Sequence, residues 1–305
     1  MVSGIAIVDK PRGMTSHDVV GRARRALRTR EIGHAGTLDP MATGVLVLGV
    51  GEGTKLLTFL TAADKAYEAT LALGTSTDSL DADGATDATV PVPPEVLAEL
   101  EILSREGRLG PRLLEAVRAE LGRTSQVPPS YSAIHVDGER AHTLARRGEL
   151  VALPARPVTV HTLEVVSDAG GEHPTLSLRV CADKGYYVRS LARDLALTLG
   201  TVGHLTSLRR TRSGCFDANE AVPLADLANL PLVPLAEAAR RALPSVVLDD
   251  ARARDARHGK RIAPEHLGAL AKGPAAWLDL EGALVAVGER TEDGEGKVLR
   301  GFGPR

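Results

Sequence analysis

The first candidate for chemistry is a single carboxylate on a constrained turn. Asp39 stands between Leu38 and Pro40 in the stretch GHAGTLDPMATGVLVLG, residues 33–49, which continues into an apolar run. Pro40 restricts the residue before it to extended conformations, which limits the directions available to the Asp39 side chain. Such a carboxylate either caps a turn or is directed at a ligand, and these residues alone leave both interpretations open.

A second candidate is the sequence Tyr186-Tyr187-Val188-Arg189, which we expect inside an alternating strand over residues 174–190. Residues two apart in a strand share a face, so Tyr187 and Arg189 would present an aromatic plane beside a fixed cation. Such a pair suits a carboxylate and a flat ligand such as a base. The alternative is that Tyr187 belongs to the core and Arg189 is an ordinary surface cation.

Several familiar cofactor motifs fail on inspection. LGVGEGTKL resembles a phosphate-binding loop, but that loop needs Gly-Lys-Ser/Thr in order, and here Thr54 precedes Lys55. SLDADG resembles a calcium loop, whose twelfth position must be Glu and is Val90 here. Cys181 and Cys215 are the only cysteines and cannot form a four-cysteine zinc site. The sequence therefore predicts neither a metal nor an organic cofactor.

The elements that must position these residues follow from hydrophobic periodicity. Thr15 and Asp18 form a predicted capping box for a helix whose exposed face carries arginines. Pro231, Pro234 and Pro244 suggest a boundary near residues 238–244, after which we expect a helix and several short strands. Strands are predicted at 4–9, 42–51, 65–78, 156–168 and 174–190, and further helices at 53–63, 94–122 (one or two) and 190–200.

The composition is that of a globular chain with room for about two domains of ~150 residues. It has 305 residues, of which 43% are hydrophobic. No apolar run approaches the ~20 residues of a membrane helix. The N-terminal MVSGIAIVDKPRG lacks the regions of a secretory signal, and two cysteines give no disulfide framework. We therefore expect a cytoplasmic protein without membrane association.

The distribution of charge says more than its total. A net charge of −2 argues against a nucleic-acid binder, but the basic residues are clustered and a divided surface binds a polyanion with one face. The alternative is that each basic cluster is an ordinary solvated helix face. The basic clusters are residues 21–30, 139–148, 208–214 and 252–261, and the acidic ones are 77–87 and the surroundings of 95–106.

Several long stretches, in order along the chain, resemble the TruB family of bacterial tRNA pseudouridine synthases, which act on uridine 55 of the T arm. The resemblance covers about residues 4–216, and the segment after it resembles a PUA-like RNA-binding module. Residues 98–112 are longer than the usual family pattern. The matching stretches are DKPRGMTSHDVV, GHAGTLDPMATGVLVLGVGEGTK, KAYEATLALGTSTDSLDADG, QVPPSYSAIHVDGERAHTLARRGE, DKGYYVRSLARDL and LRRTRSG.

The resemblance implies an α+β pseudouridine synthase fold, with a mixed, largely antiparallel sheet, flanking helices and a mobile thumb insertion at about residues 123–152. It implies a catalytic domain over residues 1–240 and a small β-rich, PUA-like RNA-binding domain over residues 241–305. The implied partner is the T-arm stem-loop of tRNA, bound by a monomer.

The implied chemistry is an isomerisation without cofactor, in which the uracil is cut from its ribose, turned and rejoined through C5. Asp39 matches the catalytic aspartate, since breaking a glycosidic bond without a metal calls for a carboxylate nucleophile or base. Whether Asp39 attacks C1′ or removes a ribose proton stays open. Arg189 matches its arginine partner, which would lower the pKa of the carboxyl by roughly 1–3 units. Tyr67 matches the aromatic residue that stacks on the target uracil.

The remaining expected contacts are with the RNA. His34 matches a residue that fills the gap left in the loop when the target base flips out, a step that costs a few kcal/mol. Tyr187 and Leu208 match residues that line the base pocket. The basic clusters at 139–148 and 208–212 would hold phosphates. The other expected substrate-binding residues are Asp78, Arg209 and Lys10.

Three alternatives remain open. A non-catalytic tRNA-binding or tRNA-folding protein on the same scaffold would not need Asp39, Tyr67 and Arg189 together. A guide-RNA-dependent synthase of the archaeal and eukaryotic type is a further relative, although the thumb and the short C-terminus favour action without a guide. A hydrolase using Asp39 would need a second carboxylate at a defined distance.

Overall fold

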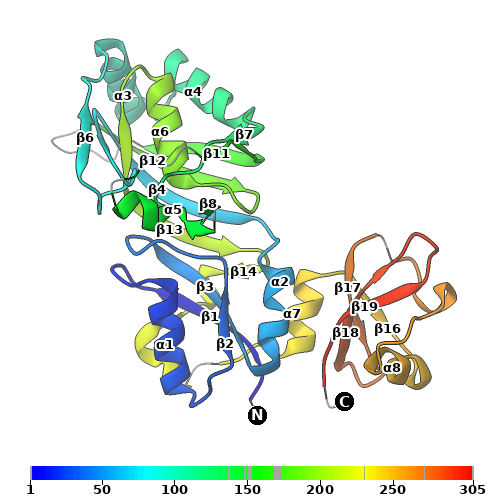
Figure 1. The fold of residues 1–305 in the computed structure, drawn as a ribbon. Helices are drawn as coiled ribbons and strands as arrows, with labels where there is room; N and C mark the ends of the chain where they lie inside the picture. The colour runs from blue at the N-terminus through cyan, green and yellow to red at the C-terminus, as the bar shows by residue number, and fades with distance from the viewer. Residues whose placement is uncertain are drawn as a thin grey trace. The chain divides into compact units, whose positions relative to one another are not determined.

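The computed structural model describes residues 2–303 except 133, 137, 148, 150–152, 168–173, 230 and 271. The chain forms two compact units (Figure 1). Unit 1 comprises Met1–Asp39, Gly44–Ala63 and Ser213–Arg305, and unit 2 comprises Pro40–Thr43 and Asp64–Arg212. The predicted division into domains 1–240 and 241–305 stays a prediction.

Unit 1 is built on strand β1, Gly4–Lys10, whose residues are almost all buried. It pairs antiparallel with β3, Thr43–Val50, and parallel with β15, Val222–Pro223. Strand β2, Ile32–Ala35, pairs antiparallel with β3. β3 and the first five residues of β1 are continuous apolar runs, as expected for strands whose residues are buried on both faces. The strands predicted at 4–9 and 42–51 are confirmed.

Helix α1, Ser16–Ala26, begins at the predicted capping box. Thr15 Oγ1 accepts a hydrogen bond from Asp18 N at 3.1 Å, and the Asp18 carboxylate accepts one from Thr15 N at 2.9 Å. The buried residues Val19, Val20 and Ala23 face β2 and the short helix η3, Leu224–Asn229, whereas the arginines are exposed. The capping box and the apolar spacing were sufficient to predict this helix.

The single helix predicted at 53–63 is wrong. The chain forms a 3₁₀ helix η1, Gly51–Lys55, followed by one turn of α-helix, α2, Leu57–Leu60. A Cβ atom at Gly53 would overlap the backbone oxygen of Gly4, so this segment passes directly over β1. The tight turn depends on glycine rather than on helical periodicity.

The C-terminal part of unit 1 carries a four-stranded sheet in the order β16-β17-β18-β19, orange to red in Figure 1. Trp277 is fully buried in its core, and Gly288 and Gly296 leave the space that its ring fills. The helix and short strands expected after residue 239 are confirmed. The elements are α7, Leu235–Ala242; β16, Ser245–Val247; α8, Asp250–Arg257; η4, Pro264–His266; β17, Pro274–Leu278; β18, Leu284–Arg290; and β19, Gly296–Gly301.

Unit 2 is built on a sheet in the order β11-β12-β4-β13. The pairs β11–β12 and β12–β4 are antiparallel, and exposure alternates along β12 with the period of two that a half-buried strand requires. The mixed, largely antiparallel sheets with flanking helices confirm the predicted α+β class. The strands are β4, Lys65–Leu73; β11, Val160–Ser167; β12, Thr175–Ala182; and β13, Gly203–Ser213.

The helices of unit 2 cover this sheet, with α4 packed on β11 and on α6. The predicted helical segment at 94–122 is two helices, separated where Gly107 adopts a φ of 66°. The helices are α3, Pro94–Glu106; α4, Pro111–Leu121; α5, Ala141–Arg146; and α6, Val188–Thr198. The short strands are β5, Thr75–Thr77; β6, Thr86–Thr89; β7, Ser125–Gln126; β8, His135–Val136; β9, Glu139–Arg140; and β10, Arg156–Pro157. In the part of the chain that the structure describes, none of the helices has the length and apolar character needed to cross a bilayer.

The strand predicted at 174–190 is wrong beyond Ala182. Strand β12 ends there, Gly185 turns the chain at a φ of 88°, and α6 begins at Val188. Tyr187 is therefore the N-cap residue of α6, and Arg189 lies in its first turn. The shared strand face that was predicted for Tyr187 and Arg189 does not exist, because the spacing of buried residues from 188 onwards is helical.

Candidate active site

Asp39 lies on the connection between β2 and β3, and the residues around it are fixed. Gly36 turns the chain at a φ of 83° directly after β2. Leu38 N donates to Ser16 Oγ at 2.9 Å, and Ser16 Oγ lies 3.2 Å from Leu38 O. Leu38 and Met41 are buried, whereas Asp39 is half-buried. The turn therefore anchors the backbone on both sides of a carboxylate that keeps part of its surface accessible.

His34 and Lys10 also belong to unit 1. His34 lies opposite Leu48 in the β2–β3 pair, and its ring packs edge-on against His17 at 5.2 Å between centroids. Lys10 is fully buried, and its ammonium donates to Pro11 O at 3.1 Å and Met14 O at 2.7 Å. These bonds compensate the burial of a charge and fix the loop that leads into α1.

Arg189 is buried in unit 2, where its guanidinium joins separate segments. Nη1 donates to Ser79 O at 2.9 Å, and Nη2 donates to Tyr131 O at 2.8 Å. Nε lies 3.6 Å from Oδ2 of Asp81, and both side chains are less than a tenth exposed. Arg189 therefore has a buried carboxylate partner, Asp81, within its own unit.

Sequence reasoning missed Asp81. Ser79 Oγ donates to Asp81 Oδ1 at 2.6 Å, and Asp83 N donates to the same oxygen at 3.2 Å. A β-bridge to Leu205 fixes the backbone of Asp81 in unit 2. Its only sequence signal was its place in the acidic run 77–87, which resembles a solvated loop more than a buried ion pair.

Asp78 and Tyr131 connect to the same region of unit 2. Asp78 is exposed; it accepts a hydrogen bond from the Tyr131 hydroxyl at 3.1 Å and one from Ala85 N at 3.0 Å. Since Arg189 holds the carbonyl of Tyr131, the structure links Asp78 and Arg189 through one intervening residue. Each carboxylate oxygen of this predicted substrate contact therefore has a protein partner, Ala85 N on Oδ1 and the Tyr131 hydroxyl on Oδ2.

The other predicted residues of unit 2 lie on its sheet and at the start of α6. Tyr67, half-buried on β4, is opposite Val180 of β12. Tyr187 packs against a small apolar cluster formed by Ile134, Ala141 and Leu153. On β13, Leu208 is buried and Arg209 is half-buried. Asp39 belongs to unit 1 and Arg189 to unit 2, and their ion pair remains a prediction.

One group among the described residues could offer three ligands to a metal. The donor atoms of Asp64, His161 and Asp183 all lie within 4.8 Å of one another, on partly exposed side chains. His161 Nε2 is 2.8 Å from Asp183 Oδ1 and 3.4 Å from Asp64 Oδ2. Hydrogen bonds from Thr159 and His161 hold the pKa of Asp183 below its usual value. The contacts of one imidazole with two carboxylates account for this cluster without a metal.

Comparison with solved structures identifies the fold. The structure titled as an H/ACA RNP bound to a substrate RNA containing 2'-deoxyuridine matches with a TM-score of 0.70 and 24% identity, over 99% of this chain and 86% of that one. A Cbf5-Nop10-Gar1 complex matches with a TM-score of 0.71 and 24% identity, over 98% of this chain and 84% of that one. At this identity the likeness establishes the fold alone, which is that of Cbf5-type pseudouridine synthases.

Sequence comparison then defines the family. The N-terminal domain model of TruB family pseudouridylate synthases matches residues 24–188, and a tRNA pseudouridylate synthase B C-terminal domain model matches residues 189–249. The chain belongs to the TruB family of pseudouridylate synthases, as its motifs predicted.

Curated relatives agree over nearly the whole length. A protein of Corynebacterium aurimucosum is 46% identical, with 93% of this chain and 91% of the relative covered. One of Thermobifida fusca is 45% identical, with 95% of each chain covered. One of Mycobacterium sp. strain KMS is 47% identical, with 86% of this chain and 84% of the relative covered. Each of these relatives is named tRNA pseudouridine synthase B.

Proposed function

We propose that this protein isomerises uridine 55 in the T loop of tRNA to pseudouridine. The observation that carries the proposal is the 44–47% identity, over most of the chain, to relatives named tRNA pseudouridine synthase B. The fixed turn that presents the partly accessible Asp39 supports it, since the reaction needs a carboxylate that reaches a nucleotide supplied from outside. The choice of the T loop and of position 55 rests on the resemblance in sequence motifs.

Asp39 is the proposed catalytic group. Its carboxylate either attacks C1′ or removes a proton from the ribose, and either route breaks the bond between N1 of uracil and C1′. The detached uracil turns and C5 bonds to C1′, which either displaces the Asp39 carboxylate or is accompanied by return of the proton to the ribose. The proton on C5 is released and N1 takes up a proton. The product has the same atoms as the substrate, so the net reaction calls for no oxidant, reductant or group donor.

Arg189 and Tyr67 are proposed to assist. Pairing with Arg189 would keep Asp39 ionised, because a neighbouring cation favours the charged form of a carboxyl group. Tyr67 would stack on the target uracil, and its hydroxyl would help to move the C5 proton. Tyr187 and Leu208 would line the pocket around the flipped base.

The surrounding surface is proposed to hold the RNA. His34 would fill the space that the flipped base leaves, since unstacking the base costs a few kcal/mol and contacts made in the gap would offset part of that cost. The thumb segment 123–152, part of which lies outside the described residues, would close over the T loop. Residues 241–305 would bind RNA as a PUA-like module. Contacts from Asp78, Arg209 and the basic cluster 139–148 complete the proposed interface, while the buried Lys10 would act indirectly by holding the loop before α1.

The test is release of tritium from unmodified tRNA labelled at C5 of its uridines, together with mapping of pseudouridine in the product. We expect one tritium released per tRNA, pseudouridine at position 55, and no release from a transcript with cytidine at that position. Release that persists from the cytidine transcript would contradict the assigned position. Tight binding without release would indicate a tRNA-binding or folding protein instead. We propose a monomer that acts in the cytoplasm, where its tRNA substrate is found.

A further inference from the structure

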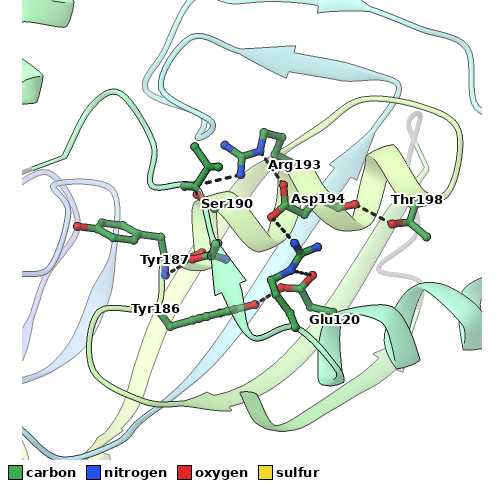
Figure 2. A network of polar contacts seen from close by, with 10 residues as sticks. Glu120, Tyr186, Tyr187, Ser190, Arg193, Asp194 and Thr198 are labelled. Atoms are coloured by element: carbon green, nitrogen blue, oxygen red, sulfur yellow. Dashed lines mark hydrogen bonds and ion pairs between the residues drawn. The ribbon is translucent and has the colours of Figure 1, made fainter. Parts of the chain in front are cut away.

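A network of polar contacts joins the segment 120–127 to the beginning of α6 (Figure 2). This segment leaves the end of α4 and enters the predicted thumb, while α6 carries Arg189 in its first turn. The contacts lie on both sides of Tyr187, the residue at which the chain changes from loop to helix. They involve side chains that the proposed catalytic mechanism does not use.

Gln126 makes the central contact of this network. Its side chain is buried, with the residue only 2% exposed. Tyr187 N donates to Gln126 Oε1 at 2.9 Å, and Gln126 Nε2 donates to Tyr187 O at 3.2 Å. One amide therefore contacts both backbone groups of one residue, as a neighbouring strand would, and Tyr187 O also accepts the first helical hydrogen bond, from Leu191 N at 3.1 Å. A two-point contact of this kind fixes the orientation of the Tyr187 backbone, which one hydrogen bond would not.

Tyr187 needs such a partner because of its place in the helix. The N–H of an N-cap residue has no partner inside the helix, and a Glu or Gln side chain at the third helical position often satisfies it. The third helical position here is Ser190, whose hydroxyl donates to Val127 O, and the N–H of the N-cap residue Tyr187 donates to Gln126 instead. Gln126 fixes the N-cap backbone from outside the helix, and it is itself held by the pairing of β7 with β10.

The remaining contacts lie on either side of Gln126, where they join the segment to α6 and to Tyr186 and link Arg123 to Glu120 within the segment. Val127 O accepts hydrogen bonds from Ser190 Oγ at 2.9 Å and from Arg193 Nη2 at 3.0 Å. The buried Glu120 carboxylate accepts from the Tyr186 hydroxyl and from Arg123 Nε, each at 2.7 Å. Burial raises the pKa of Glu120, while both hydrogen bonds oppose that shift.

We propose that Gln126 is a positioning residue for Tyr187 and Arg189. Its amide sets the backbone at the start of α6, and thereby the direction of the Tyr187 ring and of the Arg189 guanidinium two residues later. Misplacement of a reacting constellation by about 1 Å can cost on the order of a hundredfold in rate. The inference rests on the proposed roles of Tyr187 and Arg189, and it adds a residue that touches neither the base nor the reacting atoms.

The test compares Gln126→Met with wild type in single-turnover tritium release and in tRNA binding. Methionine has a similar length and lacks both hydrogen bonds. We expect the rate at saturating enzyme to fall on the order of tenfold to a hundredfold, with tRNA affinity within about threefold of wild type. Arg193→Met is the matched control, because Arg193 contacts the same segment at Val127 but does not touch Tyr187. We expect the control to remain within about twofold of wild type.

Gln126→Glu supplies a second measurement, the pH dependence of the rate, which would not change if Gln126 had only a structural role. A protonated carboxylic acid accepts from Tyr187 N and donates to Tyr187 O, as the amide does, whereas an ionised carboxylate repels that carbonyl. The rate of Gln126→Glu relative to wild type should therefore rise as the pH falls from about 8 to 5, since burial raises the pKa of such a carboxyl. This profile also decides the question if Gln126→Met fails to fold.

The outcomes separate the inference from the function on which it rests. A wild-type protein that binds tRNA and releases no tritium would overturn the proposed function. An active wild type with Gln126→Met within twofold of its rate would overturn the role of Gln126 alone. A pH-independent ratio for Gln126→Glu, or an equal rate loss in Arg193→Met, would also overturn that role.

Discussion

The turn around Asp39 and the surroundings of Arg189 are held in different ways. The Asp39 turn is fixed by a glycine at positive φ, by buried apolar neighbours and by one serine 22 residues away. Arg189 is fixed by backbone carbonyls 110 and 58 residues away and by the buried Asp81. The first arrangement leaves its carboxylate partly accessible, whereas the second buries its cation. A reactive group can therefore be presented by local structure, while the cation proposed to keep it ionised depends on the tertiary fold.

The largest effect on the surroundings of Arg189 should come from removing its charge. Arg189→Ala should destabilise the protein by ~3–5 kcal/mol, because Asp81 would be left buried without its cation. We also expect loss of tritium release. Urea unfolding and single-turnover release measure the two effects, with Arg108→Ala on the exposed surface of the same unit as the control. An equally stable and fully active Arg189→Ala protein would show that the pair with Asp81 does not contribute to stability and that the proposed pair with Asp39 is not needed for catalysis.

The second largest loss of stability should come from Tyr186→Phe, in the network that fixes the start of α6. The buried hydroxyl donates to a buried carboxylate, and a hydrogen bond to a charged group contributes ~1.5–3 kcal/mol. Burial and the neighbouring Glu120 carboxylate raise the pKa of Tyr186, so its phenol keeps its proton at neutral pH. Tyr131→Phe is the matched control, since its hydroxyl donates to the exposed Asp78 and should contribute less. Equal changes in the unfolding free energy of the two variants would argue against burial as the cause.

The Asp39 turn should respond most to Ser16→Ala. The substitution leaves the buried backbone of Leu38 without the hydroxyl that contacts both its N–H and its carbonyl, at a cost of about 1–2 kcal/mol. We expect slower catalysis with unchanged tRNA affinity, because the turn loosens while the RNA-binding surface stays intact. Thermal unfolding and single-turnover release measure the effect. A variant with wild-type rate would indicate that Pro40 and the buried neighbours hold the turn by themselves.

The smallest loss of stability is expected at the C-terminal end of α6. A substitution there should leave the rate unchanged, in contrast to one at the start of the helix. Gly200 follows the helix at a φ of 79°, and alanine there should cost about 1 kcal/mol of stability. The rate of tritium release should not change, because Gly200 lies at the end of the helix remote from Arg189. A large loss of rate in Gly200→Ala would show that the whole helix, rather than its first turn, sets the position of Arg189.

The same contrast explains what could be predicted from the sequence. The capping box of α1, the strands at 4–9 and 42–51 and the turn at Asp39 are encoded by residues close together in the chain, and these predictions are confirmed. The strands predicted at 65–78, 156–168 and 174–190 are confirmed in part, since β4 ends at Leu73, β11 begins at Val160 and β12 ends at Ala182. The fold class and the family followed from long motifs in the correct order. The roles of Asp39, Tyr67 and Arg189 remain predictions that rest on those motifs.

The predictions that failed concern segments whose shape depends on distant contacts. Residues 53–63 fold tightly because Gly53 passes over the backbone of Gly4, which periodicity does not reveal. The segment at Tyr187 alternates like a strand, but Gly185 turns it and Gln126 holds it as the beginning of a helix. Asp81 was missed for the same reason, since its partner lies 108 residues further along the chain (189 minus 81).

The most direct test of the account is Asp39→Asn, which keeps the shape of the side chain and removes its charge. Tritium release from C5-labelled tRNA would be compared with wild type, alongside tRNA affinity and thermal unfolding. The account predicts no detectable release by Asp39→Asn, with affinity and stability close to those of wild type. Release at the wild-type rate by Asp39→Asn would contradict the assignment of the chemistry to Asp39.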